Sequence, residues 1–104
     1  MSPADPRPIV TLVYQAECPA CREAKPEFAL ACRDLAAQVR GRLADIDKTK
    51  ASFPVLYTPT IQLQLPHAYY LTDPTKTPMN RLGLRVWITL CLQDAARKAA
   101  RSKP

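Results

Sequence analysis

The spacing of hydrophobic and polar positions predicts a strand near the start of the chain and a hairpin of two strands further on. Residues 9–14 are apolar without alternation, which is typical of a strand buried on both faces of a sheet. Residues 60–65 alternate between apolar and polar side chains, as expected for a strand with one wet face. A turn at 66–67 and a returning strand at 68–71 complete a predicted hairpin.

Two other stretches have the spacing of amphipathic helices. The first follows residue 18 and carries an apolar stripe to residue 39, with Gly41 where a C-terminal cap would lie. The second opens at Thr77-Pro78, an N-cap followed by a proline in the first turn. Because residues 84–92 also alternate, a strand is the competing interpretation there, and we favour the helix. The stripes are Ala24, Phe28, Ala31, Leu35 and Val39, then Leu84, Trp87, Ile88, Cys91 and Ala95.

With a short strand at 43–47 between helix and hairpin, the pattern predicts one α/β domain over residues 9–97. A flexible proline-rich tail at 1–8 and a basic tail at 98–104 flank it. The 104 residues, 47% of them hydrophobic, suffice for a single layered core. The net charge of +6 is spread along the chain, and its C-terminal basic cluster is too sparse to predict nucleic-acid binding.

No segment has the pattern of a targeting signal or a membrane span. The run at 9–14 is too short for a signal peptide, and the run at 86–92 is far shorter than the roughly 20 residues that a spanning helix needs. We therefore expect a soluble chain in the cytoplasm with no membrane contact. In that reducing compartment, cysteines stay thiols that serve catalysis, metal binding or burial.

Cys18 and Cys21 form the candidate chemical site, between the first strand and the first helix. Unpaired N–H groups and the helix dipole at this place stabilise a thiolate. Pro19 suits a first turn that has no partner for its N–H. Cys18 is the predicted nucleophile on a substrate disulfide, and Cys21 is the resolving thiol that leaves a Cys18–Cys21 disulfide. Such exchange needs no cofactor, and its partners would be protein disulfides and an unidentified thiol electron donor.

Metal binding and an inert pair are the alternatives for this Cys-x-x-Cys segment. A closed tetrahedral metal site needs two further ligands. Cys32 would lie roughly 16 Å along the helix from Cys21, and His67, the only histidine, falls in the predicted turn. We therefore favour redox chemistry and assign no metal ligand, with metal binding through a partner and a non-catalytic interaction module as the other functions.

In the order of its elements, the sequence resembles the thioredoxin-like superfamily over residues 9–95. Segment 16–21 resembles the one that carries the dithiol in thioredoxins, and Pro26 stands where thioredoxins have a helix proline. Segment 57–60 resembles the cis-proline loop that packs beside the dithiol. The resemblance implies a minimal thioredoxin-like fold, a central mixed four-stranded sheet flanked by helices, and a thiol-disulfide oxidoreductase activity.

The resemblance also implies the substrate contacts and marks two departures. Pro59 would be cis, with Thr58 pairing with an extended substrate segment and Pro19 and Ala20 beside it; an ordinary trans turn is the alternative. Glu17 replaces the tryptophan that thioredoxins have before the first cysteine, and Leu12 replaces their buried acid. No segment resembles the one that holds glutathione in glutaredoxins.

Cys32 and Cys91 fall on the two apolar stripes, so we expect both to behave as small buried hydrophobic residues. A disulfide between them is the alternative, because the two helices share a sheet face in the resembled fold. Further apolar residues around the last helix exceed one buried stripe and are candidates for a surface that binds a partner or a second copy. They are Leu82, Val86, Leu90 and Leu92.

Overall fold

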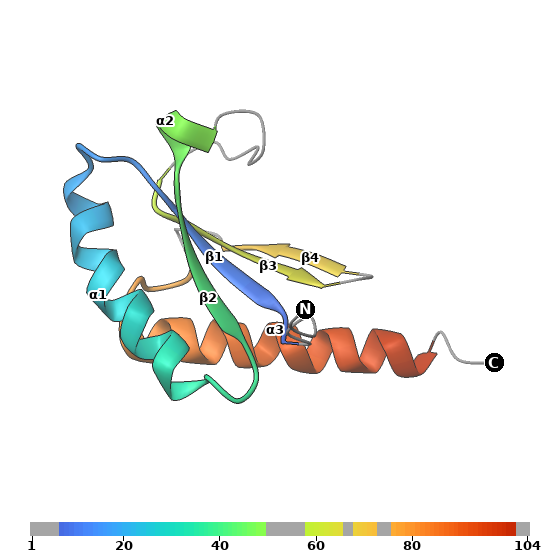
Figure 1. The fold of residues 1–104 in the computed structure, drawn as a ribbon. Helices are drawn as coiled ribbons and strands as arrows, with labels where there is room; N and C mark the ends of the chain where they lie inside the picture. The colour runs from blue at the N-terminus through green and yellow to red at the C-terminus, as the bar shows by residue number, and fades with distance from the viewer. Residues whose placement is uncertain (1–6, 50–57, 66–67, 73–75, 102–104) are drawn as a thin grey trace, which may run out of the picture.

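A computed structural model of the chain describes residues 7–49, 58–65, 68–72 and 76–101. Its elements follow the predicted order of strand, helix, strand, hairpin and helix, except for a short helix at Ile46–Thr49, where the sequence predicted the end of the second strand and a loop (Figure 1). The elements are β1 (Ile9–Tyr14), α1 (Pro19–Asp34), β2 (Arg40–Asp45), α2 (Ile46–Thr49), β3 (Thr60–Leu65), β4 (Ala68–Leu71) and α3 (Arg81–Arg101).

The strands form one mixed sheet in the order β2-β1-β3-β4. β1 pairs in parallel with β2 and antiparallel with β3, and β3 pairs antiparallel with β4. The two long helices, α1 and α3, lie together on one side of this sheet (Figure 1). The predicted fold class, an α/β domain with a mixed four-stranded sheet flanked by helices, is therefore confirmed.

The core lies between the sheet and these two helices. Val10 is opposite Leu63 in the register of β1 and β3, and Leu12 is opposite Ile61, so these four side chains share a face. All four are fully buried. Burial of each such side chain stabilises the fold by about 1.5–3 kcal/mol. The helices cover them with Phe28, Ala31, Leu35, Leu84, Ile88 and Cys91.

The end of α1 corrects two expectations. The helix ends at Asp34 with Leu35 as its C-cap, and Gly41 lies in β2 rather than in a cap. β2 itself begins at Arg40, three residues before the predicted start at 43, because the Arg40 N–H donates to the Pro8 carbonyl beside β1. Leu35 and Val39 are buried as predicted. Their four-residue spacing belongs to a turn closed by the Val39 N–H and the Leu35 carbonyl.

The C-terminal segment is a helix and not the competing strand, but its ends differ from the prediction. It begins at Arg81 instead of Thr77-Pro78, and the Asn80 side chain caps it by accepting from the Gly83 N–H at 2.8 Å. It runs on to Arg101, past the predicted boundary at 97. Leu84, Ile88 and Cys91 are buried, whereas Leu82, Val86 and Leu90 are exposed. Self-association through these exposed residues stays a prediction.

An ion pair joins the last turn of α1 to the first turn of α3. Both Asp34 carboxylate oxygens accept hydrogen bonds from the Arg81 guanidinium, at 2.6 Å each. This bidentate contact, with the charge of Arg85 nearby, lowers the pKa of Asp34. The far end of α1 is thus held against α3.

Some expectations fall on residues that are not described, and one concerns membranes. The turn at 66–67, the tail at 1–6 and the segment 50–57 lie outside the described residues. Within the described part of the chain, no helix combines the length and apolar character that a membrane crossing demands.

Gly41 and Cys32 make a close contact between β2 and α1 that can be tested by mutation. A Cβ added to Gly41 would lie 2.8 Å from the Cys32 Sγ, so the sulfur has to move. We expect Gly41→Ala to lower the free energy of unfolding more in the wild-type chain than in the Cys32→Ala variant, by about 1 kcal/mol or more. Urea unfolding of the wild-type chain, the two single variants and the double variant measures this coupling. Additive effects would contradict the contact.

Candidate functional site

The chain turns sharply between β1 and α1, and this turn places Cys18. The Cys18 N–H donates to the Gln15 carbonyl at 3.2 Å, and the Cys18 backbone is still extended. Cys18 is the N-cap of α1, where its Sγ accepts a hydrogen bond from the Cys21 N–H at 3.2 Å. A sulfur therefore occupies the position at which a serine or aspartate oxygen usually caps a helix.

Thr58 and Pro59 reach the same place from a distant part of the sequence. β3 runs antiparallel to β1, so that Thr60 at its start pairs with Val13 near the end of β1. The residues just before β3 therefore lie beside those just after β1. The Thr58-Pro59 peptide bond is cis, as predicted, and the Cys18 thiol lies 3.8 Å from the Thr58 carbonyl oxygen, to which it donates.

The two thiols differ in acidity because their surroundings differ. Desolvation raises the pKa of Cys18, but hydrogen bonds from the Cys21 thiol and N–H, the Thr58 side chain and the Ala20 backbone outweigh it and lower the pKa below its ordinary value. Burial raises the pKa of Cys21, and the hydrogen bond between the two thiols raises it further. Cys18 is thus the thiol that ionises first.

The two thiols also differ in their exposure to solvent. Cys18 is half-buried, with exposed Pro19 and Ala20 next to it, whereas Cys21 is 1% exposed. A disulfide from outside can therefore reach Cys18 but not Cys21. The structure brings together all six predicted site residues: Cys18, Cys21, Thr58, Pro59, Pro19 and Ala20.

The position of the acid that thioredoxins bury holds an apolar side chain here. Leu12 is fully buried, with 0% of its surface exposed to solvent. It packs with the core cluster and has no group that takes a proton. This position therefore offers no acceptor for a proton from Cys21.

Two features near the site were missed from the sequence. The Gln15 backbone forms hydrogen bonds with both cysteines, and backbone groups leave no mark in the residue type. The Lys25 ammonium lies 3.7 Å from the centre of the Tyr14 ring, linking the second turn of α1 to the end of β1. An aromatic residue before the dithiol and a lysine one turn after it were the available signals.

The remaining cysteines are poor nucleophiles. All four cysteines are free thiols, and burial raises the pKa of Cys32 and of Cys91 to about 11. Cys91 is buried as predicted, whereas Cys32 is only half-buried. Within the described residues, no three histidine, cysteine or acidic side chains are grouped so that they could hold a metal ion.

Comparison with known proteins defines the fold. No protein-family profile and no curated protein matches the sequence. Among solved structures, the germline-specific thioredoxin Deadhead of Drosophila melanogaster is similar, with a TM-score of 0.68 and 17% identity over 82% of this chain and 81% of that one. The Trx4 domain of ERdj5 gives a TM-score of 0.63 and 19% identity, over 86% and 82%.

A malarial protein is also similar, with a TM-score of 0.67 and 21% identity over 80% of this chain and 94% of that one. These likenesses, together with the sheet order and the two helices on one face, assign the chain to the thioredoxin-like fold.

The difference in acidity between the thiols predicts selective alkylation. We expect iodoacetamide at neutral pH to modify Cys18 faster than Cys21, Cys32 or Cys91, by about tenfold or more, because only the thiolate reacts. The rate should rise with pH to a midpoint below the ordinary cysteine pKa. Mass mapping of the labelled cysteine over a pH series measures both quantities. Cys21→Ser, which keeps the backbone N–H, should retain the fast phase, and equal labelling of all four thiols would contradict the assignment.

Proposed function

We propose that the chain is a thiol-disulfide oxidoreductase that exchanges protein disulfides through Cys18 and Cys21. The observation that supports this best is the Cys18 sulfur, which caps α1 with a lowered pKa and lies beside the Thr58 carbonyl. The thioredoxin-like fold supports it as well, since the structurally similar proteins include a thioredoxin.

In the proposed reaction, the Cys18 thiolate attacks one sulfur of a client disulfide. The client S–S bond breaks, its second sulfur leaves as a thiolate that takes up a proton, and Cys18 is left in a mixed disulfide. Cys21 then loses its proton and attacks the Cys18 sulfur. The bond between Cys18 and the client breaks, and the client's first sulfur leaves as a thiolate that takes up a proton. The client departs with two thiols, and the two electrons it gained come from the Cys18 and Cys21 thiols, which are oxidised to a disulfide. A thiol electron donor returns the pair to the dithiol, and the reverse sequence oxidises a client.

The loop before β3 supplies the place for the client. The Thr58 carbonyl lies near the Cys18 sulfur, so a client segment that runs beside Thr58 and Pro59 holds its disulfide within reach of the nucleophile. Extended segments bind in this way through main-chain hydrogen bonds. Pro19 and Ala20, both exposed, would border the same segment. This reaction suits a reducing compartment such as the cytoplasm, where a thiol donor is present.

Turnover with a disulfide substrate tests the proposal. We expect the chain to catalyse reduction of insulin by dithiothreitol, and we expect Cys18→Ser to lose all of this catalysis because it lacks the attacking thiolate. Insulin turbidity measures the rate. Cys32→Ser and Cys91→Ser are matched controls and should keep the wild-type rate. Full activity in Cys18→Ser, or none in the wild-type chain, would reject the proposed function.

The order of the two thiols has its own test. In Cys21→Ser the mixed disulfide has no resolving thiol, so a client should stay bound to Cys18. Non-reducing gel electrophoresis after incubation with oxidised insulin should reveal the covalent complex, and a reducing gel should dissolve it. The same complex formed by Cys18→Ser instead would reverse the roles of the two cysteines.

A further inference from the structure

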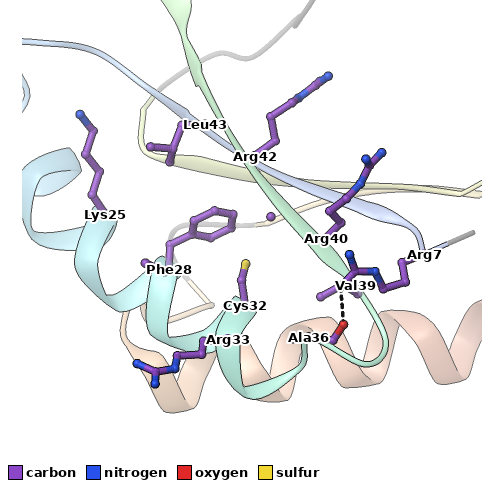
Figure 2. Close-up of a pocket in the computed structure, with 12 residues that line it drawn as sticks. Arg7, Lys25, Phe28, Cys32, Arg33, Ala36, Val39, Arg40, Arg42 and Leu43 are labelled. Carbon is purple, nitrogen blue, oxygen red and sulfur yellow. Dashed lines mark hydrogen bonds between the residues drawn. The ribbon is translucent and has the colours of Figure 1, made fainter. Parts of the chain in front are cut away.

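A pocket of about 400 Å³ lies between α1 and the edge strand β2, and neither Cys18 nor Cys21 lines it (Figure 2). Its apolar lining includes the buried Phe28 and Val39 and the exposed Ala29 and Leu43. The Cys32 sulfur lies at its base, directed toward β2 (Figure 2). A hollow of this size and lining is typical of a binding site rather than of a packing defect.

The rim of this pocket is cationic. Its five basic residues come from three places: Arg7 before β1, Lys25 and Arg33 on α1, and Arg40 and Arg42 on β2. No aspartate or glutamate lines the pocket. Such a rim around an apolar wall is complementary to a ligand that carries both negative charge and apolar groups.

The backbone of β2 adds a second recognition element. β2 is the outer strand of the sheet formed by the described residues and pairs there with β1. The Arg40 N–H points inward to the Pro8 carbonyl, so by strand alternation the backbone groups of Gly41 and Leu43 point to the outer edge. An outer edge of this kind pairs with an extended segment by strand addition.

Side-chain alternation along β2 sets the pattern of such a segment. Leu43 points toward α1, and Arg40 and Arg42 extend from the other side of the strand (Figure 2). A strand added beside β2 places every second side chain on the α1 side, against Phe28 and Leu43. Its remaining side chains lie next to Arg40 and Arg42.

We propose that this pocket and the edge of β2 bind an extended acidic peptide segment in which apolar and acidic residues alternate. The apolar side chains enter the pocket, the carboxylates meet the arginines of β2, and the peptide backbone continues the sheet. The site is separate from Cys18 and does not depend on the proposed exchange reaction; it docks a partner or client protein through a segment away from any disulfide.

The observations favour a peptide over a nucleic acid. A polynucleotide would use the cations through its phosphates, but the pocket wall offers aliphatic contacts and the strand edge offers main-chain hydrogen bonds. Proteins that bind single-stranded nucleic acids stack the bases on aromatic side chains. The aromatic lining of this pocket is Phe28 alone, and Phe28 is buried.

Fluorescence anisotropy with labelled synthetic peptides tests the proposal on the full chain. The probe is a short peptide that alternates glutamate and valine. We expect saturable binding that weakens by about tenfold or more in Arg40→Glu/Arg42→Glu, because two attractive contacts become repulsive. Arg97→Glu/Arg101→Glu on α3 makes the same change in net charge away from the pocket and should alter the affinity by less than about threefold. Circular dichroism and insulin reduction check that both variants fold.

Three further probes separate strand addition from simple charge attraction. The same peptide with lysine for glutamate, a peptide with the glutamates and valines in separate blocks, and one with alternate backbone nitrogens methylated should each bind at least about tenfold more weakly. Equal binding by any of them, or by a single-stranded oligonucleotide of the same charge, would overturn the proposal. Equal affinity of the two charge-reversal variants would overturn it as well.

Discussion

The hydrogen bond from the Cys21 N–H to the Cys18 sulfur is the contact on which the site depends. It satisfies one of the N–H groups that a helix leaves unpaired at its start, and it stabilises negative charge on the same sulfur. The contact requires β1 to end where it does, the turn through Gln15, and a first helical turn that tolerates Pro19. The contact that caps the helix therefore also favours the Cys18 thiolate, and burial of Cys21 adds to the difference in acidity between the two thiols.

The sheet adds a second segment to this site, the residues just before β3. Antiparallel pairing of β1 with β3 brings the residues before β3 to the dithiol, although forty positions separate Cys18 from Thr58. The core keeps this register, since a shift by one residue would turn Leu12 and Ile61 away from the helices. Asp34 and Arg81 hold the opposite end of α1 against α3.

Local signals account for what the sequence predicted well. Short-range spacing identified the dithiol, the helix that follows it, and the alternating strand that places Thr58 and Pro59. The predicted end of α1 was wrong because Leu35 and Val39 have helical spacing although they lie in a turn. Their side chains are apolar because they are buried in the core, not because they belong to a helix. The cationic pocket had no signal at all, since Arg7, Lys25 and Arg42 are far apart in the chain and meet only through folding.

The position of arginines on an edge strand has a consequence for the chain's own solubility. If two molecules joined their sheets through β2 with Gly41 of each at the centre, Arg40 of one copy would lie opposite Arg42 of the other across the new ladder. Like charges in cross-strand positions destabilise such a pairing, which is a common protection of sheet edges against aggregation. The edge proposed to receive an acidic strand would therefore disfavour pairing with its own copy, through the same two side chains.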